Sequence, residues 1–162
     1  KEQDWLKLDN IMLFGGARDP EHLDYCDNFY ESAFTVEGKS YPTVEHFFQA
    51  AKFYEPYSEQ IRTCKDGAEA KRLGAAKRLP REVLDAWKNG GSRRAMQQAL
   101  SAKFACGSEL AKRLVADSGD AVLVEKVEDD PTWDDKIWGA GKEGVGLNRM
   151  GVMLTNWRDE LK

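Results

Sequence analysis

A series of helix-start signals between residues 43 and 118 constrains the fold of this chain more than any other feature. Serine, threonine and aspartate are favoured before a helix because their side chains accept a hydrogen bond from an amide that the helix leaves unpaired, and proline is favoured in the first turn. Such residues introduce five predicted helices, which begin at or just after Thr43, Asp66, Pro80, Ser92 and Ser108. Two more helices are expected over residues 58–65 and 147–161. The sequence therefore predicts a mostly helical chain.

Three short segments have the pattern of β-strands. Residues 11–14 are apolar, residues 33–41 are expected to form a hairpin that turns at Gly38–Lys39, and residues 121–127 alternate as a strand does. Together with the helices, these segments predict an α+β fold, a mostly helical single domain with a small β-sheet or hairpin. The domain is expected to span residues 11–162, after an N-terminal tail or linker of residues 1–10.

The charge and the cysteine content exclude several classes of function. With 28 acidic and 24 basic residues the formal net charge is −4, whereas a dedicated duplex-DNA binder is normally basic. Local clusters of basic residues could still bind phosphorylated ligands or the ends of nucleic acids. Three separated cysteines and two histidines lack the spacing of a zinc site or a disulfide framework, so no metal is expected. The longest apolar stretch, residues 11–14, is too short for a membrane span, and we expect a cytoplasmic protein, or a nuclear one in a eukaryote.

The predicted helix over residues 43–55 carries a polar stripe. Glu45, Gln49 and Lys52 follow the helical repeat and therefore share one side, apart from the apolar side expected for Val44, Phe47, Phe48 and Ala51. Spacing alone favours a solvated face for the polar stripe. The alternative is a catalytic site, which the amine of Lys39 could join as a nucleophile if its surroundings lowered its pKa.

A second candidate region is the loop over residues 129–146. Tryptophans and aspartates are interspersed in its first part. The indole rings could stack on a base beside a carboxylate, or they could equally fill the core. Its glycines lead into the last helix, whose first turn holds Asn148 and Arg149. Free amides there could bind a phosphate, and the other interpretation of the glycines is a flexible connector.

Taken together, these segments resemble the NADAR, or YbiA-like, family. The resemblance rests above all on residues 38–53, Gly-Lys-Ser-Tyr-Pro-Thr-Val-Glu-His-Phe-Phe-Gln-Ala-Ala-Lys-Phe. Further motifs follow the order of the family, among them residues 28–30, 135–139 and 146–151. One departure is Cys26-Asp27, which stands where the family has Leu-Ser before Asn-Phe.

The resemblance implies a YbiA-like α+β fold and an N-glycosidase that needs no metal or other cofactor. The expected reaction removes ADP-ribose from guanine bases of nucleic acid or nucleosides. One alternative is hydrolysis of phosphoribosylamino-pyrimidine intermediates of riboflavin biosynthesis, and another is a non-catalytic module that binds ADP-ribose or a nucleotide. The expected partners are a small ADP-ribose or phosphoribosyl ligand and ADP-ribosylated ends of DNA or RNA, with no membrane and no metal.

The resemblance also assigns roles to residues. Glu45 matches the acid-base glutamate of the family, and Lys39, Asp135 and Trp138 match other positions of its pocket. We expect Glu45, Lys39 and Asp135 to be catalytic. The expected substrate-binding residues are Asn28, Phe29, Lys52, Trp87, Trp138, Gly139, Gly141, Asn148 and Arg149. Two routes stay open, direct hydrolysis of the C1–N bond and capture of an opened imine by Lys39 or Lys52 as a Schiff base.

Overall fold

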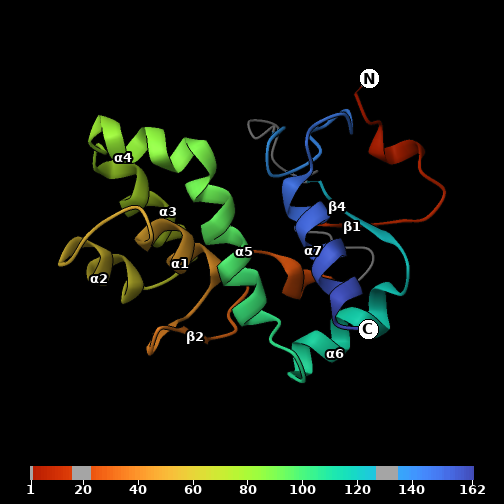
Figure 1. Ribbon diagram of the computed structural model, residues 1–162, viewed down its shortest axis with the longest axis horizontal. Coiled ribbons are helices and arrows are strands. Elements are labelled where there is room, and N and C mark those ends of the chain that lie inside the picture. Colours follow the sequence, from red (N-terminus) through yellow and green to blue (C-terminus); the bar gives the residue numbers. More distant parts are fainter. Residues whose placement is uncertain (1, 16–22, 127–134) are drawn as a thin grey trace. The chain divides into compact units, whose positions relative to one another are not determined.

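The computed structural model describes residues 2–15, 23–126 and 135–162. These residues form two compact units, which we call the middle unit (residues 28–105) and the terminal unit (residues 1–27 and 106–162). In the described parts of both units helices predominate, and the strands seen there form two small sheets (Figure 1). The predicted α+β fold with mostly helices is confirmed.

The middle unit is a hairpin followed by helices. Strands β2 (Phe34–Val36) and β3 (Lys39–Tyr41) pair antiparallel. The helices are α1 (Val44–Ala50), α2 (Tyr57–Arg62), α3 (Gly67–Ala76), α4 (Arg81–Ala86) and α5 (Ser92–Lys103). Helix α1 packs against α2, α3 and α5, and a core of Ala50, Ile61, Ala70 and Leu73 forms around its end. This central place of α1 determines the burial of its side chains.

Local hydrogen bonding explains which predicted helix boundaries were right. The side chains of Thr43, Asp66 and Ser108 each accept a hydrogen bond from the backbone amide three residues ahead, as N-caps do. Ser92 is not a cap. The backbone is non-helical at Asn89 and Gly90, between α4 and α5, and it is helical again from Gly91, so Ser92 already has helical backbone angles. Gly90 has a φ of 103°, a conformation that favours glycine.

Other boundaries differ from the prediction, among them the hairpin turn and the end of α1. The hairpin turns one residue earlier than expected, at Glu37 and Gly38, because both have a positive φ, as the tight turn of a two-residue hairpin requires. Helix α1 ends at Ala50 rather than near residue 55. The amide of Lys52 bonds to the carbonyl of Gln49 at 3.3 Å, which tightens the last turn and leaves Ala51 exposed.

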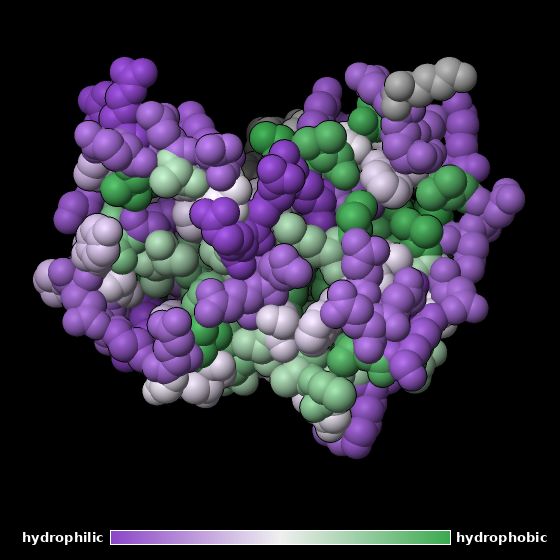
Figure 2. Space-filling model, in the orientation of Figure 1, coloured by the Kyte–Doolittle hydropathy of each residue, from purple (hydrophilic) through white to green (hydrophobic). Residues whose placement is uncertain are grey.

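The terminal unit is built on two parallel strands far apart in the chain. Strand β1 (Ile11–Phe14) pairs with β4 (Val122–Glu125), beside helices α6 (Glu109–Ser118) and α7 (Arg149–Glu160) (Figure 1). The face shown in Figure 2 carries hydrophobic side chains in small areas bordered by hydrophilic ones. Within the described ranges no helix is both long and apolar enough to cross a membrane.

Helix α7 covers the free edge of β4. The amide of Leu123 donates to Thr155 Oγ1 at 2.9 Å, while Asn148 bonds to the Leu123 carbonyl and the Glu125 amide. A side chain on Gly151 would lie 2.1 Å from the Leu123 oxygen, so only glycine permits this approach. The polar groups on this edge of β4 are thus satisfied by the helix.

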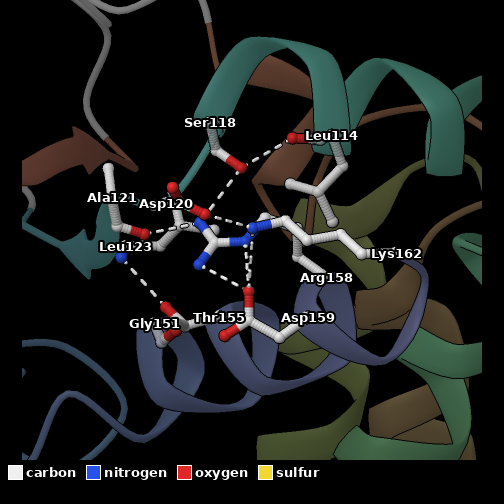
Figure 3. A network of polar contacts seen from close by, with 10 residues as sticks. All are labelled: Leu114, Ser118, Asp120, Ala121, Leu123, Gly151, Thr155, Arg158, Asp159 and Lys162. Atoms are coloured by element: carbon white, nitrogen blue, oxygen red, sulfur yellow. Dashed lines mark hydrogen bonds and ion pairs between the residues drawn. The ribbon is translucent and has the colours of Figure 1, made fainter.

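Arg158 anchors the end of α7. Its side chain is 1% exposed, and its Nη1 donates to the Ala121 carbonyl at 2.5 Å and to Ser118 Oγ at 3.2 Å (Figure 3). The guanidinium also pairs with Asp159 at 2.9 Å. The residue therefore joins α7 to the end of α6 and to the start of β4.

The segment before β1 is also held in the terminal unit. The indole nitrogen of Trp5 donates to the Gly146 carbonyl at 2.7 Å, and the Trp5 amide donates to the Gly144 carbonyl at 2.9 Å. Trp5 lies in a short 3-10 turn, Trp5–Lys7. The first residues thus contact the loop that leads into α7.

Candidate active site

The polar stripe of α1 is buried. Glu45 is 6% exposed and Gln49 is 7% exposed, so the interpretation of this stripe as a solvated face is wrong. Spacing could not reveal this, because α1 is covered by helices on several sides. The cap Thr43 sets the start of the helix, and the Glu45 amide donates to the Asn28 carbonyl at 3.0 Å. A buried carboxyl group of this kind is typical of catalytic sites.

Gln49 holds the Glu45 carboxylate. Its Nε2 donates to Glu45 Oε1 at 2.7 Å. Its Oε1 is buried and has no hydrogen-bond partner among the described residues. A buried acceptor without a donor costs free energy, so this oxygen is suited to accept a donor from a ligand. Gln49 was not among the predicted site residues, although its spacing from Glu45 was visible in the sequence.

Gly74 on α3 makes room for this pair. A Cβ atom there would lie 1.9 Å from Gln49 Oε1, which is far inside van der Waals contact. The Gly74 carbonyl also accepts a hydrogen bond from Lys52 Nζ at 3.0 Å. We call Glu45, Gln49, Lys52 and Gly74 the Glu45 cluster.

We expect Gly74→Ala to lower both stability and turnover. In most helices this change is stabilising, because glycine is less favourable than alanine by roughly 0.5–1 kcal/mol. Here the methyl group displaces Gln49, and overpacking should reverse the sign and cost about 1–3 kcal/mol. Urea denaturation measures the loss. In a Gln49→Ala background the same change should cost much less, and an equal loss in both backgrounds would contradict the contact.

The two candidate lysines differ in their surroundings. Burial lowers the pKa of Lys52, against the opposing influence of Glu45. The Lys39 amine instead donates to Glu55 at 2.5 Å and to Glu59 at 3.0 Å. These hydrogen bonds, the one to Glu55 first, raise the pKa of Lys39. The lowered pKa that a nucleophilic Lys39 would need is absent, and Lys52 meets this requirement instead.

Asn28 and Phe29 begin the middle unit, and the Asn28 carbonyl accepts the hydrogen bond of the Glu45 amide. The Oδ1 of Asn28 is a second buried acceptor that has no partner in the described part of the chain. Phe29 is 42% exposed. Its ring lies over Gly67, where a Cβ would approach it to 2.7 Å, and the Lys71 ammonium is 5.9 Å from the ring centroid. These two residues offer an acceptor and an aromatic surface.

Trp87 lies at the kink between α4 and α5. Its ring centroid is 4.9 Å from that of Phe48, so one aromatic contact holds it in place. It lines a hollow of about 460 Å³ together with Phe47 and Lys52. The position next to a Lys-Asn-Gly-Gly turn thus brings the indole to a cavity.

His46 is a structural residue. Its Nε2 is 3.2 Å from the Cys64 carbonyl, and its Nδ1 is 2.8 Å from Thr43 Oγ1. Because a carbonyl oxygen only accepts, Nε2 carries the hydrogen of this bond. Nδ1 is then left to accept the hydroxyl proton of Thr43. The ring is 0% exposed, and both nitrogens serve the helix cap and its neighbour.

The other predicted site residues belong to the terminal unit. Asp135 Oδ1 accepts the amides of Ile137 and Trp138, each at 2.9 Å. Asp135 therefore fixes the backbone at Trp138. The tryptophan and aspartates of residues 129–134 lie outside the described residues.

The start of α7 does not offer free amides. The amides of residues 147–150 donate to the carbonyls of residues 136–139 at 2.7–3.2 Å. Gly139 and Gly141 are buried, and Asn148 is 0% exposed with its side chain bonded to β4. The amides of Asn148 and Arg149 are therefore not free to bind a phosphate, while substrate binding by Gly139, Gly141 and the Arg149 side chain stays a prediction. The glycines pack the loop closely instead of forming a flexible connector.

No group of three potential metal-ligating side chains occurs among the residues that the structure describes. The chemistry that the middle unit does offer is a buried carboxyl group, an amide that orients it, an amine of lowered pKa and two unpaired acceptor oxygens.

Comparison with known proteins identifies relatives over nearly the whole chain. A model of the NADAR domain matches residues 14–162. N-glycosidase YbiA of Escherichia coli (strain K12) is 37% identical over 156 residues, covering 94% of this chain and 89% of that protein. Riboflavin biosynthesis protein VVA0006 of Vibrio vulnificus (strain YJ016) is 31% identical over 143 residues, covering 88% of this chain and 36% of that protein. The NMR structure of the E. coli protein YbiA matches with a TM-score of 0.74 at 34% identity, covering 98% of this chain and 88% of that one.

Proposed function

The chain belongs to the NADAR family, and from this premise we propose that it hydrolyses the bond between a ribose C1 and a guanine nitrogen, removing ADP-ribose from nucleic acid or nucleosides. Relatives of similar length are named N-glycosidases, and this chain is an N-glycosidase. The observation that carries the proposal is the buried Glu45–Gln49 pair beside Lys52.

In the direct route, Glu45 supplies the proton. Breaking the C1–N bond leaves positive charge on C1 and an electron pair on the departing nitrogen, which must be neutralised. The Glu45 carboxyl donates a proton to that nitrogen and then takes one from the water that attacks C1. Gln49 keeps the carboxyl in a fixed orientation through its 2.7 Å hydrogen bond.

In the lysine route, the ribose ring opens and the C1–N linkage becomes an imine. The Lys52 amine adds to C1, and the base nitrogen leaves with a proton from Glu45. A Schiff base between C1 and Lys52 remains. Water then adds to C1, the amine departs, and the sugar closes again. Lys52 suits this step better than Lys39 because burial lowers its pKa, which increases the fraction of free amine near neutral pH.

Borohydride trapping tests the lysine route. With substrate present, we expect wild-type protein and Lys39→Arg to form a reduced covalent adduct, and Lys52→Arg to form none. Trapping should become faster as the pH rises toward the lowered pKa of Lys52, because only the unprotonated amine attacks. Mass spectrometry measures the adduct. Turnover without any adduct in the wild-type protein would leave direct hydrolysis as the route.

We rank ADP-ribosylated guanine above the riboflavin intermediates as the proposed substrate for a geometric reason. An ADP-ribosylated guanine carries two bases, and the middle unit offers separate aromatic surfaces at Phe29 and Trp87. A phosphoribosylamino-pyrimidine carries only one heterocycle. The name of the Vibrio relative favours it as the second candidate. The test is the ratio of kcat/KM for ADP-ribosyl-guanosine and for the aminouracil ribosyl phosphate, and a ratio below one would reverse the order.

A non-catalytic reader of ADP-ribose is the rival function. A reader needs aromatic and polar contacts but no buried carboxyl group held beside an amine. The proposed partner is therefore a small ADP-ribosyl or phosphoribosyl ligand, or an ADP-ribosylated nucleic-acid end, that is turned over rather than only bound.

A further inference from the structure

Two hollows of the middle unit adjoin each other, and we call them together the groove. The first, of about 460 Å³, lies between α1, α4 and α5, and the second, of about 520 Å³, lies beside the segment that joins α3 to α4. They share Lys52, Tyr54 and Val83. Each volume lies in the range of pockets that hold small ligands. In Figure 2 hydrophobic side chains show between hydrophilic ones over the α1 and α4 region.

Aromatic side chains follow this groove. Trp87 lines the first hollow, Tyr57 lines the second, and Tyr54 stands where the two meet. Tyr54 is 87% exposed, so folding gains little from its ring. Tyr57 is fixed, because its hydroxyl donates to the Leu73 carbonyl at 2.6 Å. The exposed Tyr54 ring is a platform of the kind on which a base stacks, whereas the Tyr57 ring packs against the core beside Phe53.

Cationic groups line the same two hollows. Arg94 lines the first hollow, Lys77 and Arg78 line the second, and Lys52 lines both. Lys77 lies with its ammonium 4.7 Å from the ring centroid of Tyr57. Acidic groups are fewer. Glu82 lines the first hollow and Glu55 lines the second, where the Lys39 ammonium is bonded to it.

The segment that carries Trp87 is the break between α4 and α5. Asn89 and Gly90 have non-helical backbone angles, which interrupt the helix there. Trp87 and Gly91 lie on either side of this break, and both line the first hollow.

We infer that this groove binds a single strand of nucleic acid next to the modified base. The inference rests on the proposed function and names the form in which its substrate is held. The exposed Tyr54 ring and the cationic side chains that line the groove fit an unpaired base and neighbouring phosphates, whereas bases within a duplex are stacked on each other. The acidic net charge of the whole chain agrees with a local contact rather than with extensive binding of duplex.

Fluorescence anisotropy with unmodified oligonucleotides tests the groove without any turnover. The probes are labelled oligo-dT and oligo-rU of about 10 nucleotides, within the length that single-strand grooves occupy, and the same DNA annealed to its complement. We expect the single strands to bind more tightly than the duplex, and affinity to fall between about 50 and 200 mM salt. Equal affinity for duplex, or no binding at low salt, would overturn the inference.

Two variants locate the binding. Tyr54→Ala should weaken single-strand binding about tenfold, as expected for one stacked base. Lys77→Glu should weaken it and reduce the salt slope by roughly 0.7 or more, as expected for a lost phosphate contact. Lys65→Glu, the same charge change at an exposed position outside the groove, is the matched control. Losses as large in the control, or none in the two groove variants, would overturn the inference.

Hydrolysis of free ADP-ribosyl-guanosine separates this inference from the proposed function. Tyr54→Ala and Lys77→Glu should hydrolyse the nucleoside like the wild type, because neither residue belongs to the Glu45 cluster, from which only Lys52 also lines the groove. Hydrolysis of the nucleoside without strand binding would refute the groove and keep the function. Strand binding that both variants weaken, without hydrolysis of any substrate, would refute the function and keep the groove.

Discussion

Replacing Glu45 with glutamine is expected to lower kcat by about 10²-fold or more, the effect of losing an acid-base group. Glutamine has the same shape and can still hydrogen bond to Gln49, so the 6% exposed position should keep its packing. Ligand affinity should therefore change little. Steady-state kinetics with ADP-ribosyl-guanosine give kcat, and calorimetry with ADP-ribose gives the dissociation constant.

Glu109→Gln is the matched control for this variant. Glu109 begins α6 and its side chain is 93% exposed, so the same chemical change there should leave kcat unaltered. A normal kcat in Glu45→Gln would remove Glu45 from the mechanism. A fall in affinity as large as the fall in kcat would show that the residue acts in binding instead.

Arg158→Ala is expected to cause the largest loss of stability, about 3–5 kcal/mol, as for breaking a buried charged network. The change leaves the Ala121 carbonyl and Ser118 without the guanidinium that donates to both. It also empties the space of a side chain that is only 1% exposed. Urea denaturation followed by tryptophan fluorescence measures the loss.

Lys162→Ala is the comparison for Arg158→Ala. Lys162 bonds to Asp120 at 2.6 Å, but this pair lies at the surface. Exposed pairs contribute little because solvent screens them, so the free energy of unfolding should be nearly unchanged. Equal effects of the two variants would contradict the anchoring role of Arg158.

The sequence predicted the parts of the fold that local chemistry decides. Thr43, Asp66 and Ser108 cap helices because the side-chain oxygen of each accepts a hydrogen bond from the backbone amide three residues ahead. Ser92 has the same chemistry, but it follows Gly91, whose backbone angles are already helical after the break at Asn89 and Gly90. A cap signal alone could not show that the helical backbone begins before Ser92.

Features that depend on distant segments could not be predicted. Strand β1 pairs with β4 across more than a hundred residues, with Ile11 opposite Val122, and neither strand carries a mark of its partner. The burial of Glu45 and Gln49 likewise depends on the helices that surround α1. The glycine at position 74 was a usable signal, because a glycine inside a predicted helix often marks a close approach.

The central claim is that this chain breaks a C1–N bond at Glu45. Its most direct test is the release of unmodified guanosine from guanosine that carries ADP-ribose on a base nitrogen, followed by chromatography with catalytic amounts of wild-type protein. We predict many turnovers, with ADP-ribose and guanosine formed in equal amounts. Tight binding of this conjugate without release of either product, and no cleavage of the aminouracil ribosyl phosphate, would contradict the claim.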